Sequence, residues 1–310
     1  MNTLREAVKD YLATRRSLGF KLHDAGIGLL DFVSFMEQHE VGYTTTLLAL
    51  EWAQQPSSVQ PAEWARRLSY VRCFARYRSA FDLRTEIPPA GLLPHHPRRA
   101  RPYLYTDKEI RQLLEAALTL SASDDLRPWT YHGLLGLLAV SGLRISEATG
   151  LKLDDVDLSE GLLTIHGAKF GKSRLVPLHA STQQVLSDYA ARRDRLLGKR
   201  PTLYFFVSKR GARLDGGDVH RTFYTLSRQV GLRGPCSSSG PRLHDFRHRF
   251  AVHTLLQWYR AGEDVERRLP VLSTYLGHVH VSDTYWYLTA CPELMGLAVK
   301  LLEQRWEVTS

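Results

Sequence analysis

Apolar residues recur at helical spacing through the first 88 residues. The fourth predicted helix, between Pro61 and Phe81, combines one apolar stripe with an arginine-rich flank, which is typical of an amphipathic helix. This pattern predicts a helical domain over residues 1–88. The apolar positions are Leu4, Val8, Tyr11, Leu12 and Leu18, the stretches Ile27 to Met36 and Leu47 to Ala53, and then Trp64, Leu68, Val71, Ala75 and Ala80.

Prolines end the helical pattern between residues 89 and 104. They lack an amide donor and favour extended backbone in the residue before them, so a helix cannot continue there. A chain of 310 residues also exceeds the comfortable size of one hydrophobic core. We therefore expect a linker over 89–104, joining a first domain of residues 1–88 to a second domain of residues 105–310.

The second domain mixes helical spacing with one short stretch of strand-like alternation. Thr106 and Glu109 form a capping-box pattern, and the apolar run from Tyr131 to Val140 indicates a buried helix that stops at Ser141-Gly142. Two strands are predicted at 162–166 and 173–178, with a hairpin at 167–172 between them. We predict a mainly α protein with a small antiparallel β-sheet, an α+β fold. Further helices are expected from Arg144, from about Thr182 and Val219, from His244 to about Arg260, and from Pro270.

Composition indicates the kind of binding partner and the cellular environment of the protein. The formal net charge of +9 favours a polyanionic partner such as nucleic acid, although surface arginines can also be merely solvated. The three cysteines fit neither a disulfide framework nor a Cys-x-x-Cys metal site, so we expect a reducing cytoplasm. The longest apolar run, Leu134 to Val140, is too short to cross a bilayer, so no membrane association is expected.

Arginines, histidines and a late tyrosine form the candidate chemistry. Arg144 lies in Ser-Gly-Leu-Arg-Ile-Ser-Glu, His244 and Arg247 lie one helical turn apart, and Tyr287 follows His278 by nine residues. A phosphodiester can be cleaved without metal if guanidinium groups neutralise its non-bridging oxygens while a hydroxyl attacks phosphorus. We therefore expect metal-free and cofactor-free phosphodiester chemistry. Glu147, one turn after Arg144, can accept from its guanidinium and fix its direction.

Several assignments keep alternatives at this stage. Lys169 in the predicted hairpin can donate a proton as general acid, and Lys172 is its rival. Tyr285 is the alternative nucleophile. The string from His244 to His248 also imitates the zinc-protease pattern His-Glu-x-x-His with Asp in place of Glu, but no further ligand is spaced convincingly.

Together these strings resemble the tyrosine recombinase (integrase) family, which includes Xer-type recombinases and phage integrases. The resemblance spans about residues 105–290, with transposon-encoded members the most similar, while residues 1–88 resemble the SAM-like core-binding DNA domain in size and helicity. Departures are a long interval from Arg247 to His278 and a hairpin without the usual Gly-Lys-Gly. The family pattern falls on Arg144, Lys169, His244, Arg247, His278 and Tyr287.

The resemblance implies a site-specific DNA recombinase acting in integration or transposition. Tyr287 would form a 3′-phosphotyrosyl bond, Arg144, Arg247 and His278 would stabilise the phosphate charge, and Lys169 assisted by His244 would protonate the 5′-oxygen. The implied partners are double-stranded DNA and either a homotetramer on DNA or a mixed assembly with sibling recombinases, with the helix at residues 292–305 as the oligomerisation latch. Candidate DNA contacts are Arg66, Arg67, Arg72, Arg76, Arg98, Arg99, Arg101, Lys172 and Arg174.

Two other functions remain open. A type IB topoisomerase-like enzyme would share the nicking chemistry without strand exchange. A catalytically idle DNA-binding partner of sibling recombinases would need only the basic surfaces, so the complete set of six candidate residues argues against it.

Overall fold

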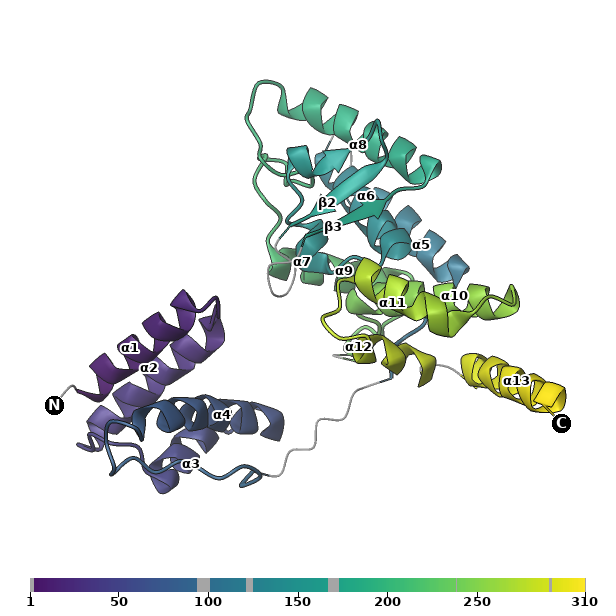
Figure 1. Cartoon of the computed structure of the whole chain (residues 1–310). Helices are drawn as coiled ribbons and strands as arrows, with labels where there is room; N and C mark the ends of the chain where they lie inside the picture. The colour runs from purple at the N-terminus through teal and green to yellow at the C-terminus, as the bar shows by residue number, and fades with distance from the viewer. Residues whose placement is uncertain are drawn as a thin grey trace. The chain divides into compact units, whose positions relative to one another are not determined.

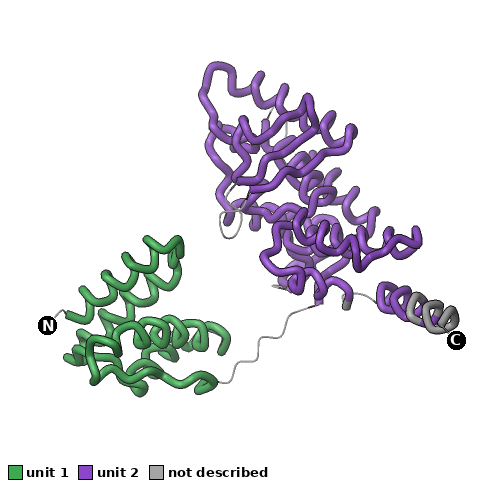
Figure 2. The backbone as a smooth tube through the Cα atoms, in the orientation of Figure 1, with its two compact units in different colours: residues 1–100 green, residues 101–310 purple. Residues whose placement is uncertain are grey.

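The computed structural model describes residues 3–93, 101–120, 125–166, 173–237, 239–289 and 292–309, without the side chains of residues 289, 301, 302 and 304–309. The chain divides into two compact units, Met1–Ala100 and Arg101–Ser310 (Figures 1 and 2). The division falls inside the predicted linker at 89–104. Each unit has a hydrophobic core of its own.

The first unit contains the helices α1 (Leu4–Ser17), α2 (His23–Gln38), α3 (Thr46–Gln54) and α4 (Pro61–Arg78). Aromatic side chains from three of them, Phe32, Trp52 and Phe74, are fully buried in its core. The predicted helices are present, but five of the apolar positions lie outside the buried faces, because Leu18, Ile27, Leu30, Leu47 and Ala80 are exposed. Leu18 follows the end of α1, and Gly19 with φ of 88° turns the chain away.

A central helix organises the second unit. Helix α6 (Leu126–Ser141) is buried along most of its length and packs against α5 (Asp107–Leu118), α8 (Ala180–Leu197) and α10 (His244–Arg260), while α9 (Gly216–Gln229) packs against α5. The predicted capping box at the start of α5 is present: the Thr106 hydroxyl accepts from the Glu109 amide at 3.2 Å, and Glu109 accepts from the Thr106 amide at 2.7 Å.

The small sheet has the strand order β1-β2-β3 and is antiparallel throughout (Figure 1). Strands β2 (Leu162–Ile165) and β3 (Arg174–Pro177) form the predicted hairpin pair, whereas β1 (Val156–Asp157) is too short to show an alternating pattern in the sequence. The predicted mainly α fold with one small antiparallel sheet is therefore confirmed. In this register Arg174 lies opposite Ile165, at the start of β3.

The C-terminal part builds a second core in this unit from α10, α11 (Val265–Leu276), η3 (Trp286–Thr289) and the start of α13 (Pro292–Thr309), with α12 (Ser282–Tyr285) between α11 and η3. Helix α11 begins five residues before the predicted start at Pro270, because the Asp264 carboxylate caps it by accepting from the Arg267 amide at 3.1 Å. The other short elements are α7 (Ile145–Ala148) and η1 (Leu153–Asp155).

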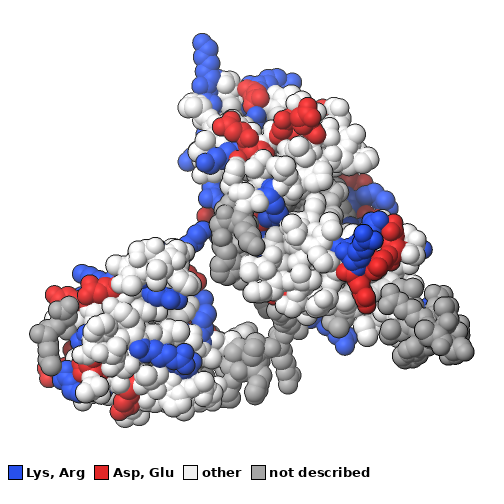
Figure 3. All heavy atoms as spheres, viewed as in Figure 1, with Lys and Arg blue, Asp and Glu red and all other residues white. Residues whose placement is uncertain are grey.

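Basic and acidic side chains are interspersed on the visible face of both units (Figure 3). Within the described ranges, no helix combines the length and the apolar character that crossing a bilayer requires. The two cysteines that the structure describes, Cys73 and Cys236, are free and exposed.

Candidate active site

Arg144 lies at a sharp turn between α6 and α7. Helix α6 ends at Gly142, whose φ of 61° is the left-handed conformation that glycine tolerates best, and a Cβ there would lie 2.6 Å from Phe250. Arg144 then occupies the N-cap position of α7. Its amide donates to Glu147 Oε2 at 2.9 Å and its Nη1 to Glu147 Oε1 at 2.8 Å, which is the orienting contact that the spacing predicts.

Arg247 is almost fully buried in the first turns of α10, with 1% of its surface exposed. Its guanidinium donates to the Gly142 carbonyl at 2.9 Å and to the Leu276 carbonyl at 2.6 Å. Burial lowers the pKa of Arg247 to about 10, while the nearby Tyr287 hydroxyl opposes this shift. Arg247 therefore remains charged at neutral pH and brings a cation into a site of low polarity.

His278 and Tyr287 lie beside these arginines. His278 Nδ1 is 2.7 Å from the buried Thr284 hydroxyl, and its ring is nearly parallel to that of Tyr287, at 6.0 Å between centroids. Burial, followed by the charges of Arg247 and Arg144, lowers the pKa of His278 to about 4. A neutral imidazole at pH 7 is thus held between two cations and a phenol.

Tyr287 is 3% exposed and Tyr285 is 54% exposed, so only Tyr287 belongs to the buried cluster. Tyr287 lies on the 3₁₀-helix η3, which directly follows α12. Residues two apart point to different sides of a helix, so the two tyrosines lie in different environments.

The second histidine of the His244–His248 string packs beside Tyr287. The His248 ring lies 5.6 Å from that of Tyr287 and 4.6 Å from that of His244, nearly perpendicular to it. Burial, followed by the charge of His244, lowers the pKa of His248 to about 4. His244 itself lies at the exposed edge of the site, yet desolvation, followed by the charge of Arg247, lowers its pKa.

The zinc-protease alternative finds no support in this geometry. Its acidic residue, Asp245, is buried and accepts hydrogen bonds from the Arg242 amide at 2.8 Å and from the Arg242 guanidinium at 2.9 Å. Asp245 therefore stabilises the start of α10 by pairing with a charge. Among the residues that the structure describes, no group of three or more His, Cys, Asp or Glu side chains could hold a metal ion.

The predicted DNA contacts and the lysines divide into three groups. Lys169, Lys172, Arg98 and Arg99 lie outside the described residues. Arg66, Arg76 and Arg101 are exposed. Intramolecular contacts are made by Arg66 with Glu63 and Asp24, by Arg67 with Asp31 and the Trp52 carbonyl, by Arg72 with the Pro88 and Pro89 carbonyls, and by Arg174 with Glu147.

Four neighbours of the site were missed by the sequence patterns. Thr284 and the carbonyls of Tyr275, Leu276 and Gly277 all accept or share hydrogen bonds with the candidate residues. Backbone carbonyls carry no side-chain signature. A threonine three residues before the candidate nucleophile is a weak signal, because helical spacing also fits a packing role.

The arrangement can therefore hold an anion between Arg144 and Arg247 with a phenol and neutral histidines beside it. Residues 104–293, more than half of the chain, match the phage integrase family. The chain belongs to this family of tyrosine recombinases. The match includes the described candidates Arg144, His244, Arg247, His278 and Tyr287, and it also extends over the segment that contains Lys169.

This tyrosine recombinase is 59% identical over 311 residues to y4rB of Sinorhizobium fredii, a protein named as an integrase/recombinase, with 99% of each chain covered. Among solved structures, the Tn1549 transposon integrase matches 98% of this chain and 99% of its own, with a TM-score of 0.68 and 16% identity. A lambda integrase chain matches 91% of this chain and 77% of its own, with a TM-score of 0.61 and 18% identity. These two likenesses show the shared fold.

Proposed function

We propose that this enzyme cleaves and rejoins DNA at specific sites through a 3′-phosphotyrosyl intermediate. The observation that carries the proposal is the meeting of Arg144, Arg247, His278 and Tyr287 from four separate segments of the chain. Two buried or half-buried cations beside a hydroxyl are the groups that phosphodiester transfer requires without metal.

Each residue has a role in the proposed reaction. The Tyr287 hydroxyl releases its proton as its oxygen attacks the scissile phosphorus, forming a Tyr–O–P bond while the bond to the 5′-oxygen breaks, so one proton is released for the one that the 5′-oxygen takes up. Arg144 and Arg247, which now donate to the Gly277 and Leu276 carbonyls, would donate to the non-bridging oxygens, and His278 would assist them. Lys169, with His244 assisting, would supply the proton that the 5′-oxygen takes up. A 5′-hydroxyl of the partner strand then reverses these steps, so the number of phosphodiester bonds is conserved.

The proposed substrate is double-stranded DNA. The net charge of +9 supports it, because cations that displace condensed counterions bind nucleic acid. The exposed Arg66, Arg76 and Arg101 are candidates for contacts to phosphate, and we propose that the helical domain of residues 1–88 serves as the core-binding domain. The lambda integrase and Tn1549 integrase structures were both solved with DNA.

We further propose that strand exchange takes place in a tetramer on DNA, in integration or transposition. Joining two duplexes requires four cleavages, and the lambda integrase neighbour is a tetramer bound to a Holliday junction. The Tn1549 integrase neighbour carries transposon right-end DNA. An assembly with sibling recombinases would supply the same four active sites.

The nucleophile can be tested with a matched pair of tyrosine variants. Tyr287→Phe should abolish covalent trapping on nicked suicide duplexes drawn from the DNA that flanks its own gene, while DNA binding stays unchanged. Tyr285→Phe removes a hydroxyl two residues away and should leave trapping intact. Denaturing electrophoresis of the protein–DNA adduct gives the readout. Persistent trapping by Tyr287→Phe would move the role to another residue.

A second assay separates recombination from topoisomerase-like activity. The recombinase proposal predicts joined products when two labelled duplexes are mixed, with few relaxed circles from supercoiled plasmid. Relaxation without any joined product would instead support a type IB topoisomerase-like enzyme. DNA binding without an adduct would support the idle partner.

A further inference from the structure

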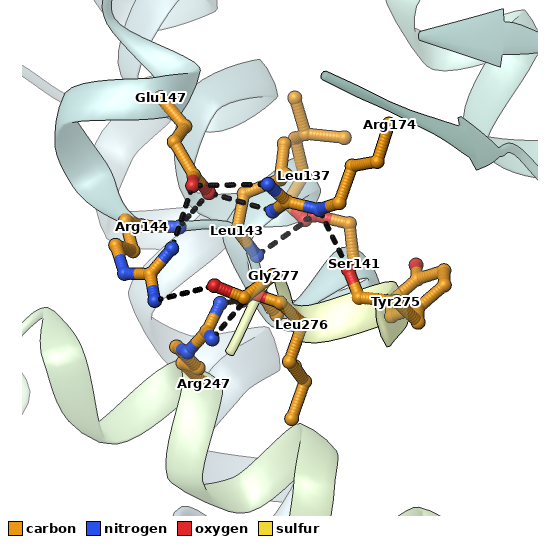
Figure 4. A network of polar contacts seen from close by, with 11 residues as sticks. Leu137, Ser141, Leu143, Arg144, Glu147, Arg174, Arg247, Tyr275, Leu276 and Gly277 are labelled. Carbon is orange, nitrogen blue, oxygen red and sulfur yellow. Dashed lines mark hydrogen bonds and ion pairs between the residues drawn. The ribbon is translucent and has the colours of Figure 1, made fainter. Parts of the chain in front are cut away.

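Arg174 is the most completely engaged arginine beside the site. It begins β3, and its side chain is 9% exposed. Its Nη1 and Nη2 donate to the two oxygens of Glu147 at 3.2 and 2.9 Å, and its Nε donates to the Tyr275 carbonyl at 2.7 Å (Figure 4). All three nitrogens of the Arg174 guanidinium therefore already donate within the protein. Little hydrogen-bonding capacity remains for a DNA phosphate.

Glu147 joins Arg174 to Arg144. Its side chain is 8% exposed, and each of its oxygens accepts from both arginines: Oε1 from the two guanidinium groups, and Oε2 from Arg174 and the Arg144 amide. Burial alone would raise the pKa of Glu147, but the hydrogen bonds from Arg174 and Arg144 lower it, so the carboxylate is charged. A buried anion 2.8 Å from Arg144 would compete with a phosphate for that arginine unless another cation balanced it.

Three successive backbone carbonyls at the end of α11 accept hydrogen bonds from arginine side chains. Tyr275 accepts from Arg174, Leu276 from Arg247 and Gly277 from Arg144 (Figure 4). Cations suit the C-terminus of a helix, where free carbonyls carry partial negative charge. When Arg247 and Arg144 turn to a phosphate, only the bond from Arg174 remains of these three.

Gly277 allows this close approach. Its φ is 66°, and a Cβ added to it would lie 2.7 Å from Arg174 Nη1 and 3.1 Å from Arg174 Cζ. The next residue is His278, whose amide donates to the Ser273 carbonyl at 3.0 Å. Arg174 therefore lies directly against the turn that places His278.

We propose that Arg174 is a positioning residue for strand cleavage. It balances the charge of Glu147, which leaves Arg144 available to the scissile phosphate, and it holds the Tyr275–Gly277 backbone that places His278. This role rests on the proposed function and replaces the expectation that Arg174 contacts DNA. Arg174 would act on the phosphate only through Glu147, Arg144 and His278.

The test compares Arg174→Met with Arg221→Met, an arginine on α9 that is 71% exposed, because both changes remove one positive charge. We expect single-turnover cleavage of suicide duplexes by Arg174→Met to fall about 100-fold, since small displacements of catalytic groups cost rates of this order. DNA affinity and its salt slope should match those of Arg221→Met. A selective loss of affinity with a slope reduced by about one would show a phosphate contact and overturn the proposal.

A double variant tests the route through Glu147. If Arg174 acts by balancing this carboxylate, Glu147→Gln in the Arg174→Met background should recover part of the lost cleavage rate, because the uncompensated charge is removed. Additive losses in the double variant would overturn the charge-balancing role. Arg174→Lys, which keeps the charge but not the two-point pair, should cleave faster than Arg174→Met and also serves if Arg174→Met is poorly folded.

Hydrogen exchange gives a readout that needs no DNA. The amides of Gly277 and His278 should exchange at least several-fold faster in Arg174→Met or Arg174→Lys than in Arg221→Met, as measured by mass spectrometry on the full chain. Unchanged exchange would overturn the positioning role. If the wild-type chain forms no adduct with any duplex while exchange still responds to Arg174, the proposed function fails and the structural part of the inference stands.

Discussion

At the scale of single residues, the site combines charged arginines with neutral histidines. Burial lowers the pKa of both His248 and His278 to about 4, so neither imidazole adds a positive charge at pH 7. Among the residues that the structure describes, the cations that face an incoming phosphate are then Arg144 and Arg247. Neutral histidines can still donate one hydrogen bond each, which suits a group that assists the arginines.

The shifted pKa of His248 predicts a loss of stability in acid. In the unfolded chain this histidine titrates near 6.5, whereas in the folded chain it titrates near 4, so only the unfolded state binds the proton between these values. Stability should therefore be full above about pH 6.5 and fall as the pH drops towards 4. Urea unfolding at several pH values measures the slope.

His248→Gln should reduce this pH dependence, because it removes one of the two imidazoles whose pKa burial lowers to about 4. The exposed His280 supplies the control, and His280→Gln should keep the wild-type slope. An identical slope in wild type, His248→Gln and His280→Gln would show that His248 does not contribute to the acid loss and that other groups, such as His278 or paired carboxylates, cause it.

At the scale of elements, the ends of two helices decide where the arginines and His278 lie. Helices α6 and α11 both end at a glycine with positive φ, Gly142 and Gly277. The carbonyls at these ends, those of Gly142 and Leu276, are bridged by Arg247. The ends of these two helices therefore also supply the carbonyls that hold Arg247 in the site.

Gly277→Ala and Gly262→Ala form a matched pair that separates backbone strain from crowding. Both glycines have a φ near 66–69°, but nothing lies within 4 Å of an added Cβ at Gly262. Each change should cost about 1–2 kcal/mol from the left-handed backbone alone. Gly277→Ala should lose more and should also slow cleavage, because its Cβ meets Arg174. Thermal unfolding and suicide-substrate cleavage check this, and equal behaviour of the two variants would contradict it.

At the scale of the whole molecule, the last helix, α13, contributes to the hydrophobic core of its own unit. Leu294, near the start of α13, is fully buried with residues of α10 and α11, and Glu293 forms an ion pair with Arg260. The proposed latch at residues 292–305 therefore begins with a segment that packs within its own unit. Met295 and Val299 are half exposed and carry apolar surface on the same helix.

Two truncations should separate these roles. A chain ending at Met295 keeps Leu294 and should fold with a near-normal melting temperature, yet fail to assemble two duplexes into a synapse. A chain ending before Pro292 should also lose about 2–4 kcal/mol of stability, because removing a buried leucine leaves a cavity. Calorimetry and native gel shifts measure the two effects. Normal synapsis by the first truncation would rule out the latch.

The sequence by itself determined the mainly α fold class, the capping box at Thr106 and the family. These features rest on local spacing: helical periodicity, strand alternation and short motifs are all set by neighbouring residues. The contact between Arg144 and Glu147 was predictable for the same reason, since three residues make one helical turn.

Only the tertiary structure decided what surrounds those residues. Glu147 meets Arg174 from 27 positions away, and Arg144 and Arg247 reach carbonyls 133 and 29 positions away. The start of α11 at Asp264 and the 3₁₀ turn at Tyr287 depend on capping and packing that periodicity does not record. Such contacts form where separate helices and strands pack against one another. Their relative positions are set by the packing of the whole core rather than by any local sequence pattern.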